Sequence, residues 1–269
     1  MKNLLLGVFI LLLFPFTFCY ALETDRYINA RAYSMGKTAS VISGFLNPAT
    51  SGYFSSRYFS MEYLNRYGVK ELSSFAVMLN YPNNYLNSGV YFSRYGFDAY
   101  NEQLASINFY KKLSPLISLG GRVNYLGVHY SDQEQDAVAV TGDMGILLHP
   151  VENLHFSLLV MNPLRSEIKM EDETRELANV FLLGLSYQPE SRFLLTTEIE
   201  KDFNRSVIYK LGMEYTPIKQ LSFRTGMWTK PFTPSFGVGI KLSPVNIDLA
   251  FSNHPVLGFN SCCALQFNF

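Results

Sequence analysis

Hydrophobic and polar residues alternate along most of this chain from residue 53 onward. The alternation comes in segments of about ten residues, and a period of two indicates a β-strand with one apolar and one polar face. The pattern therefore predicts an all-β fold. We expect fourteen strands, at roughly 53–64, 72–81, 87–96, 102–112, 116–129, 137–148, 153–162, 178–188, 192–201, 206–215, 220–229, 235–242, 245–252 and 259–269.

The connections between these segments differ in a regular way. Every second connection is short and usually contains proline, whereas the others include two longer charged stretches, 130–136 and 163–177. Short turns at one end and longer loops at the other are typical of outer-membrane β-barrels. A soluble β-sandwich would also alternate, with its apolar face turned to a core, so periodicity alone does not decide between the two.

The two ends of the chain favour the membrane barrel. Residues 1–21 have the features of a secretory signal peptide: Lys2, an apolar core over 4–14, and a Cys19-Tyr20-Ala21 stretch similar to a cleavage site. The last segment alternates up to a terminal Phe269, which would promote aggregation at an exposed edge in water but suits the aromatic girdle of a barrel.

We therefore expect a transmembrane antiparallel β-barrel of about fourteen strands in the Gram-negative outer membrane, formed by residues 51–269. Its partners would be outer-membrane lipid and the barrel-assembly machinery. An alternating final strand that ends in Phe resembles the signature which that machinery reads, so Phe267 and Phe269 are the expected assembly signal.

Composition excludes several other classes of function. The chain has 22 basic and 22 acidic residues and no basic run, so nucleic acid is not an expected partner. Two of its three cysteines are adjacent, which excludes a disulfide framework. No nucleotide-binding, zinc-protease or serine-hydrolase motif occurs, and the four histidines fall in separate segments. We expect neither an enzyme nor a cofactor or metal site.

In a barrel, the polar face of each strand turns to the lumen. Segment 137–148, for example, places Val140 and Ile146 on the lipid face and Asp143 on the other. Mixed charge in the lumen favours either a neutralising network or a polar wall that contacts a ligand over an ion-selective ring of one sign. The polar residues assigned to the lumen are Arg122, Asn124, Asp143, Glu198, Glu200, Lys210, Glu214, Arg224, Lys241 and Asp248.

Residues 22–50 do not alternate, and they carry too few charges to stay solvated. Apolar side chains such as Tyr33, Met35 and Phe45 need shelter, which the lumen of a wide barrel offers. We therefore expect a small hatch in the periplasmic half of the barrel, with Asn47-Pro48 turning the chain into the first strand. A disordered periplasmic tail is the alternative.

The hatch also carries a family resemblance. Its Ala30-Arg31-Ala32, Met35-Gly36 and Asn47-Pro48-Ala49 stretches resemble the mature N-termini of two groups of outer-membrane barrels. These groups are the FadL family of long-chain fatty-acid transporters and the PorV/PorQ-type barrels associated with type IX secretion. The resemblance implies a barrel whose hatch includes Arg31, Met35, Gly36, Asn47 and Pro48.

The two groups imply different functions. A PorV/PorQ-type barrel would bind secretion-system proteins, whereas a FadL-like barrel would transport small or hydrophobic molecules. FadL-type transporters are longer, with a larger hatch and longer extracellular loops. We therefore favour a partner-binding barrel of the PorV/PorQ type from the sequence, and keep FadL-like transport as the alternative.

Overall fold

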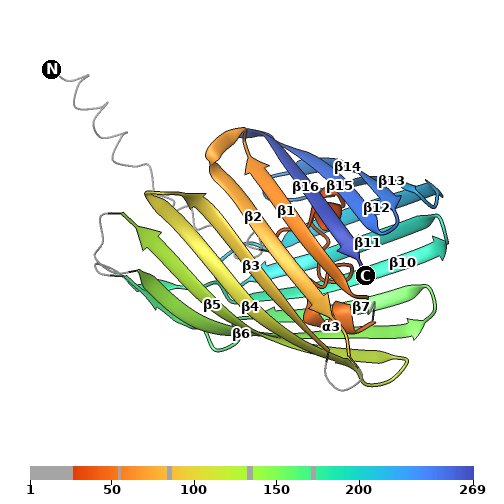
Figure 1. Cartoon of the computed structure of the whole chain (residues 1–269), viewed down its shortest axis with the longest axis horizontal. Coiled ribbons are helices and arrows are strands. Elements are labelled where there is room, and N and C mark those ends of the chain that lie inside the picture. Colours follow the sequence, from red (N-terminus) through yellow and green to blue (C-terminus); the bar gives the residue numbers. More distant parts are fainter. Residues whose placement is uncertain (1–26, 54–55, 84–86, 132–135, 171–173) are drawn as a thin grey trace.

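The computed structural model describes residues 27–53, 56–83, 87–131, 136–170 and 174–269. The expected signal peptide lies outside these residues. The described chain forms a closed barrel of fourteen antiparallel strands (Figure 1). In order around the barrel, the strands are β1 (Tyr58–Arg66), β2 (Val69–Tyr81), β3 (Asn87–Phe97), β4 (Tyr100–Lys112), β5 (Ile117–Tyr130), β6 (Ala137–Val151), β7 (Leu154–Met161), β10 (Val180–Glu190), β11 (Phe193–Asp202), β12 (Ile208–Ile218), β13 (Leu221–Trp228), β14 (Thr233–Leu242), β15 (Val245–His254) and β16 (Gly258–Asn268).

The first and last strands close the barrel. β1 pairs with β16 in register from Tyr58 opposite Asn268 to Asn65 opposite Ser261. Each of the fourteen segments predicted from the alternation coincides with one strand, so the predicted fold class is confirmed. The first segment was predicted to begin too early, because residues 48–53 form a helix before β1 starts at Tyr58.

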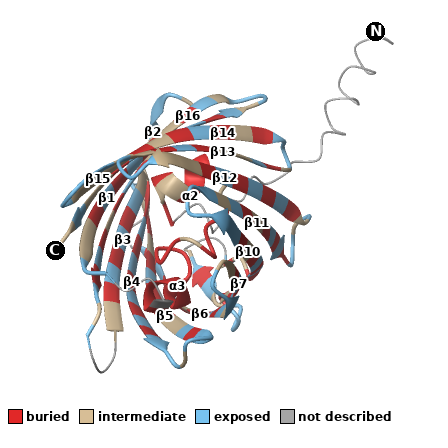
Figure 2. Cartoon of the chain, turned by 90° about the vertical axis from the view of Figure 1, so that its right-hand side faces the viewer, coloured by how far each residue is buried: buried red, intermediate tan, exposed pale blue. Residues whose placement is uncertain are grey.

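Burial alternates along the strands as a barrel requires (Figure 2). On β6, Val140 and Met144 are 63% and 69% exposed on the outer face, while Thr141 and Asp143 between them are buried on the lumenal face. The outer wall is therefore apolar and the inner wall polar over much of its height. In the described residues, no helix is long and apolar enough to cross a membrane.

Residues 27–53 lie inside the barrel, and we call them the plug (Figure 2). They contain α2 (Ala30–Ser34) and α3 (Pro48–Tyr53), joined by turns. Among residues 27–52 all are buried except Asn29, Arg31, Lys37 and Ile42. The segment expected to be a lumenal hatch thus occupies the lumen. It continues to residue 53 because Asn47-Pro48 begins a helix instead of turning directly into β1.

Residues at the ends of the two plug helices explain where each helix begins or ends. Asn29 caps α2, since its side-chain oxygen accepts a hydrogen bond of 2.9 Å from the backbone N–H of Ala32. Gly36 follows α2 with φ +67°, a conformation that glycine adopts without strain. Pro48 occupies the first position of α3, where its missing N–H costs nothing. Both helices are too short to be stable alone, so the barrel wall must hold them.

A small hairpin interrupts the connection between β7 and β10. It consists of β8 (Glu167–Lys169) and β9 (Thr174–Glu176), within the charged stretch 163–177 that was expected to be a longer loop. The charged side chains of Glu167, Lys169 and Glu176 are exposed, whereas Ile168 is 1% exposed and packs in the apolar cluster of the barrel interior. The hairpin lies at the end of the barrel opposite the C-terminus. We call that the loop end and the other the turn end.

Candidate functional site: the plugged lumen

The lumen has three layers of different chemistry. Near the loop end a cluster of inward side chains is apolar, beside the buried Glu102 and Asp202, and we call this cluster the apolar chamber. A charged belt surrounds the plug at mid-height, and small polar residues line the turn end. The chamber includes Leu64, Leu104, Leu126, Val128, Met161, Leu182, Ile208 and Trp228, and the turn end includes Ser60, Asn80, Ser118, Ser157, Ser186 and Ser222.

The structure places all ten polar residues assigned to the lumen on the inner wall. Eight of them are buried; Asp248 is half-buried, and Lys241 is exposed at the turn end, where both line a cavity. The assignment omitted Glu62, which alternates with the outward Met61 and Tyr63 and is 2% exposed. The same alternation rule would have found it.

The first cluster of the belt joins β5 and β6 to the plug. Arg122 donates to Asp143 over 2.9 and 2.6 Å, and its Nη1 donates to the backbone carbonyl of Phe45 in the plug over 2.7 Å. Its guanidinium also lies 3.8 Å from the ring centroid of Tyr27. Because the pair is buried, removing one partner would leave an uncompensated charge at a cost of roughly 3–5 kcal/mol.

A second cluster holds the middle of the plug. The Nζ of Lys210 lies 2.6 Å from Glu198 and 2.7 Å from Glu200. The other carboxylate oxygen of Glu198 accepts a hydrogen bond of 2.7 Å from the backbone N–H of Ser40. Two carboxylates beside one ammonium leave acceptor capacity free, and the plug backbone uses it.

A third cluster holds α2. Glu62 of β1 accepts hydrogen bonds from the backbone N–H of Ala30 at 2.6 Å and from the side chain of Asn29 at 3.0 Å. Arg31 reaches across the lumen to Glu214, which also binds Arg224. The Glu214 carboxylate raises the pKa of Arg31, so this guanidinium stays charged at any physiological pH.

Glycines on the inner wall let the plug backbone approach the strands closely. A Cβ on Gly145 would overlap the side-chain oxygen of Asn47, and one on Gly226 would overlap the backbone of Met35 and Gly36. Four more inward glycines would meet the plug in the same way. They are Gly120, Gly184, Gly212 and Gly237. The plug is thus seated against the wall itself, and inward glycines were the sequence signal for it that the alternation analysis did not use.

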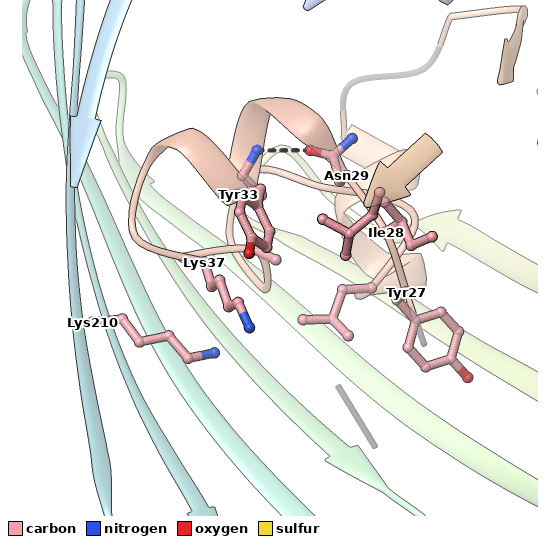
Figure 3. Close-up of a pocket in the computed structure, with 10 residues that line it drawn as sticks. Tyr27, Ile28, Asn29, Tyr33, Lys37 and Lys210 are labelled. Atoms are coloured by element: carbon pink, nitrogen blue, oxygen red, sulfur yellow. Dashed lines mark hydrogen bonds between the residues drawn. The ribbon is translucent and has the colours of Figure 1, made fainter. Parts of the chain in front are cut away.

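Cavities lie on both sides of the plug. On the turn side a cavity of about 440 Å³ is lined by plug residues, the belt and small polar side chains. On the loop side a pocket of about 30 Å³, enough for one water molecule, lies between the plug and the wall (Figure 3). Lys37 and Lys210 extend toward it, and Lys37 Nζ stands 4.8 Å from the Trp228 ring centroid. The described residues include no cluster of three or more metal-binding side chains.

Comparisons with solved structures agree with this architecture. The chain resembles the Pseudomonas putida toluene transporter TodX at a TM-score of 0.69 and 13% identity, over 91% of this chain and 99% of that one. The monoaromatic hydrocarbon channel CymD gives 0.66 and 12%, over 90% and 97%. A Pseudomonas aeruginosa FadL homologue gives 0.61 and 10%, over 90% and 98%. No protein-family model and no curated protein sequence matches the chain.

These findings define the class of protein. The chain is a multi-pass β-barrel of the outer membrane with the fold of FadL-like channels. Its turn end is periplasmic and its loop end extracellular. The similar structures are transport channels and not enzymes, and nothing in the comparisons supports the PorV/PorQ interpretation favoured from the sequence. They favour the FadL-like alternative.

Proposed function

We propose that this protein is an outer-membrane channel for small hydrophobic molecules, gated by its plug. The observation that carries the proposal is the apolar chamber at the extracellular end. A water-filled porin has a polar interior, whereas Leu104, Leu126 and Trp228 present apolar surface to the lumen here. The similarity to hydrocarbon channels supports the same class of solute.

The side chains of the chamber are packed, with Leu104 and Leu126 each 2% exposed, so a solute enters as they move apart and then meets an apolar environment. Removing apolar surface from water contributes roughly 25 cal/mol per Å², so burying about 150 Å² would contribute about 4 kcal/mol. A polar sugar would gain nothing comparable, and it would lose hydrogen bonds to water. The chamber therefore selects for solutes that are small and apolar.

The plug separates the chamber from the periplasmic cavity. A solute in the chamber would meet Tyr27, Tyr33 and Lys37 on the upper face of the plug, and the cavity lies on the other side. Because the plug is held by hydrogen bonds and ion pairs to the belt, its movement requires those contacts to exchange for water. We infer that passage is gated by the plug and is not free diffusion.

Uptake of toluene into liposomes that contain the purified protein tests the proposal. We expect uptake faster than in protein-free liposomes, with no matching increase for a sugar. Leu126→Asn, which makes the chamber polar, should slow toluene uptake several-fold. Thr216→Asn places the same side chain at the periplasmic end, and it should leave uptake unchanged. Toluene uptake equal to that of protein-free liposomes would overturn the proposal.

A further inference from the structure

The outer wall of the barrel carries a hollow of its own. It has a volume of about 650 Å³, within the range of pockets that hold a drug-sized molecule, and it lies over β1 to β6, the orange to green strands of Figure 1. Its floor contains the small outward residue Ala105, which stands opposite Phe92 on one side and Tyr125 on the other. The rest of the outward lining is Phe59, Val77, Leu79, Val90, Ile107, Val123 and Val140.

Outward glycines flank this hollow. Gly142 stands opposite Val123, and Gly127 stands opposite Gln103. A Cβ on Gly142 would come no closer than 3.6 Å to another atom, and one on Gly127 no closer than 3.9 Å. Unlike at the inward glycines, a Cβ here would make only ordinary van der Waals contacts, and neither glycine has a positive φ. Glycine weakens a strand, and close approach of another molecule is one of the settings in which strands contain it, beside bulges and bends.

A polar row borders the hollow on its extracellular side. Arg94 and Gln103 stand opposite each other on β3 and β4. Each lies two residues closer to the extracellular end than Phe92 and Ala105. The Arg94 side chain is 46% exposed, and its only ion pair within the described residues is a 3.5 Å contact with the fully exposed Asp98. Such surface pairs are worth about 0–1 kcal/mol, so Arg94 remains available to a stronger anion.

We propose that this hollow is a binding site for lipid A, the phosphorylated lipid of the outer leaflet. An acyl chain would lie over Ala105, between Phe92 and Tyr125, and a phosphate would pair with Arg94. Guanidinium groups bind phosphate through two parallel hydrogen bonds, which favours this partner. Arg94 lies three residues from the extracellular end of β3, at the depth of outer-leaflet headgroups, and this selects lipid A over inner-leaflet phospholipid.

Native mass spectrometry of protein extracted from outer membranes in mild detergent tests the site. We expect the wild-type protein to retain lipid A, and Ala105→Trp, which fills the hollow, to retain at least ten times less. Arg94→Gln should reduce retention by a smaller factor. The matched control is Leu183→Trp on β10, four strands away from β4 around the barrel, since Leu183 is 55% exposed on the lipid face.

Heat-modifiable migration in gels shows that each variant folds, which separates lost binding from lost structure. Equal lipid A retention by Ala105→Trp and Leu183→Trp would overturn the proposal. So would retention of phospholipid in place of lipid A by the wild-type protein. The test does not depend on transport, because the site faces lipid and not the lumen.

Discussion

Arg31 of the plug and Glu214 of β12 form a bidentate ion pair, in which Nε and Nη2 lie 2.9 and 2.8 Å from the two carboxylate oxygens. Charge-assisted hydrogen bonds contribute roughly 1.5–3 kcal/mol, and the 35% exposure of the Arg31 side chain places this pair toward the lower value. Arg31→Gln should then raise the population of displaced plugs about tenfold.

Opening events in planar bilayers measure that population. We expect Arg31→Gln to open about ten times more often than the wild-type channel. The control is Lys241→Gln, which removes a lumenal charge that forms no ion pair with another described residue. If both variants opened equally often, the general loss of lumenal charge, and not this pair, would control the plug.

Two glycines on β6 allow the contact between plug and wall to be tested separately from the stability of the strand itself. Gly145→Val would drive a side chain into Asn47, whereas Gly142→Val would place the same side chain toward lipid, where its Cβ meets no atom closer than 3.6 Å. Overpacking typically costs about 1–3 kcal/mol, and in Gly145→Val it should destabilise the bound position of the plug. Hydrogen exchange of residues 43–49 should accelerate in Gly145→Val and stay at the wild-type rate in Gly142→Val. Identical exchange in both variants would show that the close contact is dispensable.

The outward alternation predicts a further contrast. Ile146→Arg places a charge on the lipid face, which costs about 2–4 kcal/mol near the midplane and should lower the yield of heat-modifiable barrel. A lumenal control must avoid residues that hold the plug, such as Ser118, whose hydroxyl donates to the Ala49 carbonyl of α3. Gln266→Arg faces the open periplasmic cavity instead, and it should assemble normally. A lower yield for Gln266→Arg than for Ile146→Arg would contradict the face assignment.

The sequence predicted the wall well because a two-residue period is a property of each strand alone. Val140 and Asp143 already show which face meets lipid, and no long-range information is needed to place them. The same logic could have placed Glu62, which was overlooked. Strand number and closure followed from counting segments.

The plug and the hairpin were harder, because long-range contacts decide their structure. α2 is five residues long and depends on Glu62, Arg224 and Glu214 of distant strands for its position, so no local period reveals it. The role of lumenal charge was likewise undecided between a network and a ligand wall. In the structure, many of the charged lumenal side chains form hydrogen bonds or ion pairs with the plug. The chamber was missed because its apolar residues interrupt the polar face only near the strand ends.

The terminal residue gives a prediction about assembly. Phe269 is 66% exposed, and its N–H donates to the Arg57 carbonyl over 3.2 Å, so it contributes little buried surface. We expect deletion of Phe269 to lower the amount of protein in outer membranes far more than the unfolding temperature of the molecules that assemble. Equal losses of both would point to a role in folding and not in recognition by the assembly machinery.

Removal of residues 22–46 tests the plug as a whole. The deletion removes α2 and leaves α3 attached to β1. It also removes the backbone N–H of Ala30, which donates to Glu62, and that of Ser40, which donates to Glu198. Water can replace those donors once the lumen is open, so the barrel should still assemble. Because the deleted segment fills the belt, single-channel conductance should rise severalfold over that of the wild-type protein. An assembled barrel with unchanged conductance would mean that another part of the chain closes the lumen, and the gating proposal would then fail while the apolar chamber remained.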